Sequence, residues 1–243
     1  GRERFLMLFL VLTFGLGIFS ANTARAINDS RSDRIYYSTG TDVVIDAFWR
    51  MESNDDDSGY AELDFSQFET LSGVQTATKV LKQDVNLAVG GQRQKAAAEL
   101  MAIEPGKFSQ TAWFRNDLLP IHWWNYCSAL VDCKSGVLAS RSLEEKGVQL
   151  GDTVTVRWGG NDSIDLTVIA FVDYWPSMDP TATIVTNERT GETETKDFLV
   201  ANYNYIRKLI DTQPYQIWLK LADGASSEQL YNDITEKNIK IQN

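Results

Sequence analysis

The stretch GVLASRSLEEKGVQLGDTVTVRWGGNDSIDLTVIAFVDYWP, residues 136–176, contains the clearest succession of structural elements in the chain. Its first five residues form an apolar run typical of a buried strand, and residues 141–146 favour one or two helical turns. Gly151 and Asp152 then open a strand, and the turn signal at residues 159–162 leads into a returning strand. The stretch therefore predicts a hairpin of the kind found in small β-barrels and sandwiches.

The sequence after this stretch predicts a second hairpin and then a mixed ending. Residues 189–192 read as the turn of the hairpin, and residues 203–210 as a short helix. Residues 216–221 alternate as a strand, residues 226–237 have the apolar spacing of an amphipathic helix, and residues 239–241 return as a strand. A strand, a helix and a strand in succession predict a C-terminal βαβ unit.

The sequence before the stretch predicts further strands. Residues 42–49 read as a strand, residues 51–60 as a polar loop, and residues 64–71 as a short helix capped by its leading aspartate. Residues 73–89 have the period of a half-buried strand. Residues 92–103 are ambiguous, because their alanines favour a helix whereas a preceding glycine pair favours the second strand of a hairpin. A proline-glycine turn and a short helix follow at residues 104–111. The fold class predicted from these elements is α+β.

The chain begins with an apolar segment. Residues 5–20 carry no charged side chain, and the uncharged residues up to Ala24 lengthen the segment to a membrane span. Arg2 and Arg4 precede it, so the start should remain cytoplasmic and everything after about residue 26 should lie outside. In the other interpretation the segment is a secretory signal, cleaved after a small-x-small site to leave an N-terminus near Ile27.

These patterns divide the chain into three parts. We expect a transmembrane helix over residues 1–26, an extracytoplasmic stalk over residues 27–41 and a core domain over residues 42–243. The core could consist of two subdomains, one made of residues 42–135 plus 201–243 and the other of residues 136–200.

Composition and motifs argue against most enzymatic and nucleic-acid functions. The formal net charge is -10, and no cluster of basic residues is present to bind phosphates. His122 is the only histidine, so neither a serine or cysteine nucleophile nor a zinc ion would find its usual partners. Asp173 and Asp179 are the one local pair of carboxylates that could serve a hydrolase, and they read more simply as loop residues. We expect no catalytic, cofactor or metal site.

Two groups of residues remain as candidates for structural or binding roles. Cys127 and Cys133 could form a local disulfide in an oxidising compartment, or both could remain free thiols. A tryptophan-rich group could form core or, where exposed, contact a partner, because tryptophans are favoured at interfaces. Its members are Trp113, Trp123, Trp124 and Trp175.

The central stretch resembles FtsX-like ABC transporter permeases, specifically their MacB-type extracytoplasmic core domain. The residues that carry the resemblance are Gly136, Val137, Leu138, Ser140, Leu143, Gly151, Asp152 and Pro176. Residues 198–230 resemble the segment that follows in this family, and the apolar start and residues 73–80 occur in the expected order. Ala170 departs from the pattern, since a glycine is common there. The resemblance covers nearly the whole chain.

The resemblance implies a mechanical role outside the membrane. It favours a retained transmembrane helix and a strand at residues 92–103. It also implies a separate cytoplasmic ATPase subunit and a dimer of permease chains or of permease halves. The domain would then couple ATP hydrolysis to substrate export, lipoprotein release or mechanotransmission. The alternative hypothesis is a secreted or singly anchored binding or sensor module.

Overall fold

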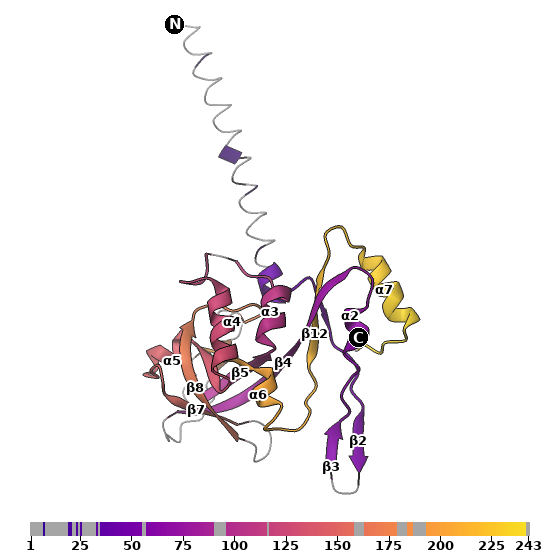
Figure 1. The fold of residues 1–243 in the computed structure, drawn as a ribbon. Coiled ribbons are helices and arrows are strands. Elements are labelled where there is room, and N and C mark those ends of the chain that lie inside the picture. Colours follow the sequence, from indigo (N-terminus) through magenta and orange to yellow (C-terminus); the bar gives the residue numbers. More distant parts are fainter. Residues whose placement is uncertain are drawn as a thin grey trace.

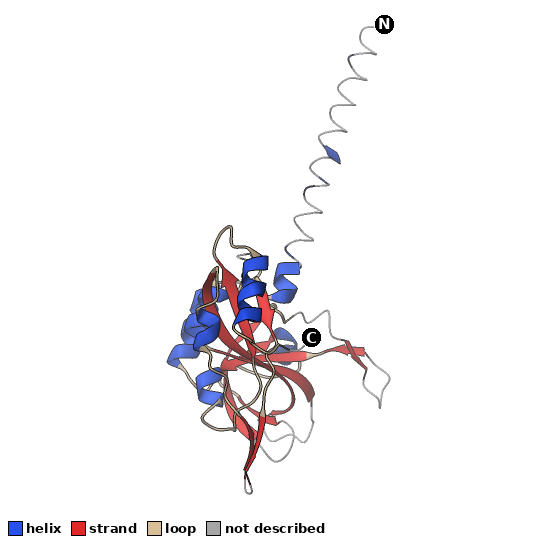
Figure 2. Ribbon diagram, turned by 90° about the vertical axis from the view of Figure 1, so that its right-hand side faces the viewer, coloured by secondary structure: helices blue, strands red, loops and turns tan. Residues whose placement is uncertain are grey.

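The computed structural model describes residues 35–54, 57–89, 96–115, 117–157, 163–178, 184–186 and 193–241, with a few single residues before residue 35. The described chain is α+β, with one eight-stranded mixed sheet and several short helices (Figures 1 and 2). Most of the apolar segment at residues 5–20 lies outside these ranges. Among the described residues, no helix has the length and apolar character needed to cross a membrane.

The large sheet contains strands from both ends of the described chain. In chain order they are β1 (Val43–Ile45), β4 (Val74–Val89), β5 (Ala96–Ile103), β6 (Gly136–Ser140), β7 (Thr153–Arg157), β8 (Ser163–Val172), β11 (Asp197–Asn202) and β12 (Gln216–Leu221). Two separate hairpins pair β2 (Met51–Asn54) with β3 (Asp57–Tyr60), and β9 (Ile184–Thr186) with β10 (Thr193–Thr195). The helices are α2 (Ser66–Glu69), α3 (Pro105–Thr111), α4 (Trp123–Asp132), α5 (Arg141–Glu145), α6 (Tyr203–Ile206) and α7 (Ser227–Glu236).

The sheet closes on itself through its longest strand. The strand order is β1-β12-β4-β5-β11-β6-β8-β7, and β7 also pairs with the end of β4. The strands from β4 to β7 therefore form a closed ring, as expected of a small barrel. The first half of β4 pairs instead with β12, which carries β1 as the outermost strand. One strand thus joins the barrel to the flat extension of the sheet.

Two apolar cores lie on the two faces of the closed sheet. Val137 and Ala139 of β6 pack in one core, whereas Leu138 between them packs in the other, beneath α3 and α4. The same alternation occurs in β11, where Leu199 and Val200 belong to different cores. Because both faces are covered, these two strands are buried along their whole length, which explains the apolar runs at residues 137–139 and 198–201.

A buried polar network fixes α5 against the sheet. Asp197, at the start of β11, is only 1% exposed. Its carboxylate accepts hydrogen bonds from Ser142 Oγ at 2.6 Å and from Lys146 Nζ at 2.9 Å. Ser140 Oγ accepts a hydrogen bond from Phe198 N–H at 3.2 Å. The serines of the central stretch therefore connect α5 to a strand more than fifty residues away.

Most of the predicted strands are confirmed. β7 and β8 form the antiparallel hairpin expected from the central stretch. The ambiguity at residues 92–103 is settled in favour of a strand, since β5 pairs with β4. α7 begins where expected, with the Ser226 side chain accepting a hydrogen bond from Gln229 N–H. The division of the core into two subdomains stays a prediction.

Four local predictions are corrected. The expected polar loop at residues 51–60 contains the β2–β3 hairpin, because strand pairing uses backbone groups that polar sequences also supply. The helix expected from residue 64 begins later, since the Asp64 side chain accepts from Ser66 N–H. The helix expected at residues 203–210 ends at Ile206 and continues only as single turns. The last predicted strand is reduced to one bridge, from Ile241 to Ala47.

Candidate functional site

The first described helix ends where the chain enters the sheet. Residues 35–39 are helical, and Gly40 N–H donates to Tyr36 O at 2.7 Å. Gly40 has a φ of 82°, the left-handed conformation that commonly ends helices. A side chain there would also collide with the core, because a Cβ would lie 2.6 Å from Cζ3 of Trp218. Only glycine satisfies both conditions without strain.

Three separate segments of the chain hold the end of this helix. We call residues 35–41, together with the residues of these segments that they contact, the joint. Trp113 N–H, after α3, donates to Gly40 O at 2.8 Å. Ser177 N–H, after β8, donates to Tyr37 O at 2.8 Å. Thr41 Oγ1 donates to the Leu219 carbonyl of β12 at 2.8 Å. Because the three points come from different elements, the end of the helix cannot turn without moving the domain or breaking contacts.

Aromatic side chains fill the space between these hydrogen bonds. Tyr36 stacks on Trp113 with ring centroids 5.8 Å apart, and Tyr37 meets the edges of both Trp113 and Tyr174. Ser177 has a φ of 63°, which is unusual for a residue other than glycine. Lys82 Nζ holds it by donating to its carbonyl and hydroxyl oxygens, both at 3.1 Å. Strained residues of this kind persist where their surroundings hold them firmly.

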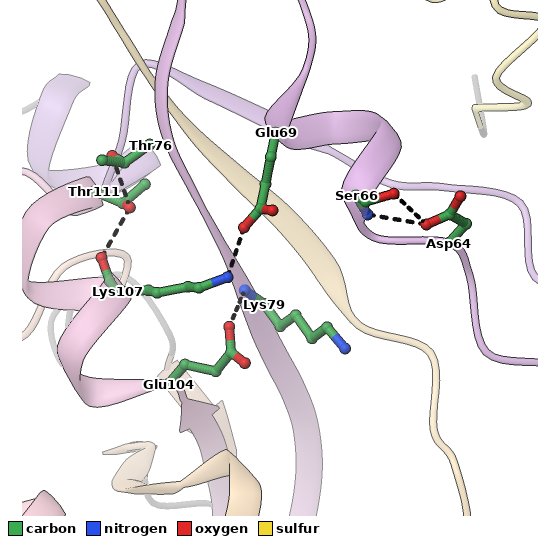
Figure 3. Close-up of polar contacts among 8 residues, drawn as sticks. All are labelled: Asp64, Ser66, Glu69, Thr76, Lys79, Glu104, Lys107 and Thr111. Atoms are coloured by element: carbon green, nitrogen blue, oxygen red, sulfur yellow. Dashed lines mark hydrogen bonds and ion pairs between the residues drawn. The ribbon is translucent and has the colours of Figure 1, made fainter.

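The helix that carries one side of the joint is itself braced. Figure 3 shows Thr111, at the end of α3, donating to Thr76 of β4 at 3.0 Å. At the other end of α3, Lys107 forms an ion pair with Glu69 of α2 at 2.6 Å. The carboxylate of Glu104, just before α3, accepts from the backbone of β4 at 3.4 Å. These contacts fix α3 to β4, and so fix the joint to the strand shared by barrel and extension.

A cavity of about 670 Å³ lies beside the joint. Trp113, Phe114 and Trp123 supply its aromatic wall, and Gln75 and Thr76 of β4 lie among its polar residues. Gln75 is the extra residue of a β-bulge, because Lys220 of β12 pairs with Thr76 and the next pairing skips to Val74. Bulges often redirect a side chain beside a functional site. The cavity is mixed in character, since Asp42, His122 and Lys220 also line it.

The structure separates the four predicted partner-contact tryptophans. Trp175 is completely buried and stacks on Phe108 with ring centroids 5.9 Å apart, so of the two roles left open by the sequence it has that of a core residue. Trp113 is half-buried in the joint, and Trp123 is half-buried against Phe114. Trp124, one residue later on α4, is 57% exposed. Of the four, Trp124 is the side chain most available to a partner.

The two cysteines are free thiols in this structure. Cys127 is buried on the inner side of α4, and Cys133 follows the end of that helix. Burial raises the pKa of the Cys127 thiol to about 12, so it remains protonated and unreactive at neutral pH. A disulfide between them stays a prediction.

The described side chains that were considered for catalysis form structural hydrogen bonds or ion pairs. His122 caps α4, with its Nδ1 accepting from Trp124 N–H at 3.2 Å. Asp173 forms an ion pair with Arg141 at 3.3 Å, and Asp179 lies outside the described residues. Within the described part of the chain, no group of three or more metal-ligating side chains comes together.

Neither the protein-family models nor the curated proteins include a match to this chain. The chain is similar to several solved structures. One is the extracellular domain of the noncanonic ABC-type transporter YknZ from Gram-positive bacteria, with 13% identity, a TM-score of 0.47 and coverage of 83% of this chain and 100% of that one. Another is the periplasmic region of MacB from Actinobacillus actinomycetemcomitans, with 16% identity, a TM-score of 0.46 and 84% of each chain covered.

Sequence reasoning missed the joint. Its polar members, Thr41, Thr111 and Ser177, are small residues whose roles depend on contacts between distant segments. One signal was available, because Gly40 directly follows residues that can be helical and precedes a strand, as a helix-ending glycine does. The partners of that glycine could not be found from local pattern.

Proposed function

We propose that this chain is the extracytoplasmic domain of an FtsX-like, MacB-type ABC transporter permease, and that it passes movement of its membrane segment to the outside. The observation that carries this proposal is the joint. Residues 35–41, which follow the apolar segment in the sequence, are held by three different elements of the folded domain. A simple tether would need no such attachment.

Motif residues of the family resemblance support the proposal by the structural roles they fill. Gly136 lies where a Cβ would meet Ile169 at 2.8 Å and the Cys133 carbonyl at 2.9 Å. Gly151 has a φ of 89°, and the carboxylate of Asp152 accepts from Gln149 N–H to close the turn before β7. These are backbone requirements of one particular fold, which explains why the motif needs these residue types.

In this proposal the chemistry occurs elsewhere. A separate subunit hydrolyses ATP in the cytoplasm. The permease forms a dimer of chains or of permease halves, and its helices convert the free energy of hydrolysis into movement. Residues 1–26 cross the membrane and residues 27–41 form the stalk, with the rest outside the cell or in the periplasm. The domain then drives export of a substrate, release of a lipoprotein or control of an outer partner, with no cofactor of its own. Rigid, contiguous elements are what such coupling requires.

A flexible insertion distinguishes this proposal from a singly anchored binding or sensor module. The variant carries Gly-Ser-Gly-Ser between Arg34 and Ile35, in the native full-length protein with its ATPase. The control carries the same four residues between Gly159 and Gly160, in the β7–β8 turn. We expect both proteins to reach the membrane at wild-type amounts, to co-purify with the ATPase, and to hydrolyse ATP. Only the control should complement a strain that lacks the gene.

Two results would contradict the proposal. Full complementation by the stalk insertion would mean that rigidity is unnecessary, which favours a tethered binding module. The second result comes from alkaline carbonate washing of native membranes, followed by mass spectrometry of the N-terminus. Release of a protein that begins near Ile27 would identify the apolar segment as a signal peptide and leave no membrane movement to transmit.

A further inference from the structure

Helix α4 buries one apolar face and carries two exposed apolar side chains on another side. Tyr126, Cys127 and Leu130 point into the core beneath the helix. Trp124 and Val131, seven residues apart and therefore on one side of the helix, are 57% and 49% exposed. A surface helix normally presents polar side chains at such positions.

A third exposed apolar side chain lies just before the helix. Ile121, just before the helix, is 52% exposed. We call Ile121, Trp124 and Val131 the outer α4 face. Exposed tryptophans within an apolar stripe are typical of binding surfaces, where they supply much of the affinity.

A basic pocket of about 410 Å³ lies at the C-terminal end of the outer α4 face, and Val131 lines it. Lys107, Lys134 and Lys208 also line it, with Glu104 as the opposing carboxylate. Among the described residues, neither Lys134 nor Lys208 forms an ion pair, whereas Lys107 is paired with a glutamate of α2. In a chain with a net charge of -10, two unpaired lysines at the end of an apolar stripe form a local positive site.

We infer that the outer α4 face and the basic pocket together bind an acidic amphipathic helix of a partner protein. The distance along α4 from Trp124 to Val131 is about 10 Å, the spacing of apolar residues seven apart on a second helix. Acidic residues flanking that partner's stripe would meet Lys134 and Lys208. This surface lies apart from the joint and does not depend on the transporter role.

The charge pattern favours a peptide over a lipid surface. Binding to anionic bilayers typically uses clusters of about four to eight basic residues, and this site has three lysines, one of them already paired.

The test uses the full chain in nanodiscs of neutral phosphatidylcholine, with empty nanodiscs as the blank. Two fluorescent 18-residue helical peptides share one leucine stripe, and one carries glutamates on its flanks whereas the other carries lysines. Fluorescence anisotropy should show the glutamate peptide binding at least about tenfold more tightly. Trp124→Ala should weaken it about tenfold or more, as expected for a central tryptophan. The double variant Lys134→Glu, Lys208→Glu should reverse the charge preference.

The matched control is Tyr231→Ala, because Tyr231 is an aromatic residue of α7 that is 64% exposed and lies outside this surface. It should bind the glutamate peptide as tightly as wild type does. Absence of binding, equal affinity for both peptides, or an unchanged affinity in Trp124→Ala would overturn the inference. Displacement of the peptide by phosphatidylglycerol vesicles, but not by phosphatidylcholine vesicles, would assign the surface to lipid instead.

Discussion

Replacing Gly40 by alanine should damage the joint more than the same change at any glycine in open space. Two costs combine at this position. The φ of 82° disfavours a side chain, and the new Cβ would lie 2.6 Å from Cζ3 of Trp218. Trp218 cannot yield easily, because it is completely buried and its ring lies 5.4 Å from that of Phe108.

Other glycines of the chain allow the two costs to be measured separately. Gly147 has a φ of 95°, and a Cβ added there would meet no atom within 4 Å, so Gly147→Ala should cost only the backbone term, about 1–2 kcal/mol. Gly106 lies in α3 with open space around it, so Gly106→Ala should gain up to about 1 kcal/mol. Gly40→Ala adds overpacking of about 1–3 kcal/mol to the backbone term, for a total of about 2–5 kcal/mol.

The assay is urea unfolding of the full chain in a mild non-ionic detergent, followed by tryptophan fluorescence. The chain has a second way to relieve the strain, because residues 35–40 can detach while the sheet remains folded. In that case the loss in unfolding free energy is limited to the contacts of the joint, and trypsin should cut faster after Arg34. A Gly40→Ala protein as stable as Gly147→Ala, with unchanged cleavage after Arg34, would refute the reasoning.

Three further predictions concern single groups. Asp197→Ala should lower the free energy of unfolding by about 2–3 kcal/mol in urea titrations, because it removes the acceptor of two hydrogen bonds from a buried site; an unchanged midpoint would count against the network. With a thiol reagent at pH 8, Cys133 should react at least about a hundredfold faster than Cys127, whose thiol has its pKa raised by burial; no reaction of either until reduction would reveal the disulfide. The hydrogen bond from Lys79 lowers the pKa of Glu62, so this pair should stabilise the protein above pH 4.5 and lose that effect as the pH falls further. Glu62→Gln should flatten the acid side of a pH–stability curve, and a curve identical to that of wild type would exclude the pair.

Strands with local turn signals were predictable from the sequence. The glycine pairs in the sequence after β4 and β7 indicate hairpins, and the period-two pattern of residues 216–221 identifies β12. The hairpin pattern of the central stretch also predicted a small barrel or sandwich. In each case the decisive interaction lies within a few residues of the signal, so a local pattern is sufficient.

The closure of the sheet could not be predicted in the same way. β4 pairs with β7 across more than sixty residues, and the sequence of neither strand indicates which strand it pairs with. The burial of Trp175 has the same cause, because its position depends on α3 and α4 packing over the sheet. Helix α4 itself was not predicted, since its sequence is rich in aromatic residues that favour strands as much as helices. The joint is the extreme case, because the contacts that hold the end of its helix connect distant segments.

The position of β4 determines how movement of the stalk would reach the rest of the molecule. β4 pairs with β12 beside the joint and with β5 and β7 in the barrel, and its Lys82 holds the Ser177 loop. A displacement at Gly40 therefore acts on one strand that belongs to both halves of the sheet, so the domain should move as a rigid body. Helix α4 packs on the same sheet and touches the joint through the stacked pair Phe114 and Trp123. A partner held on the outer α4 face would thus be carried with the stalk, although its binding and the movement rest on different residues.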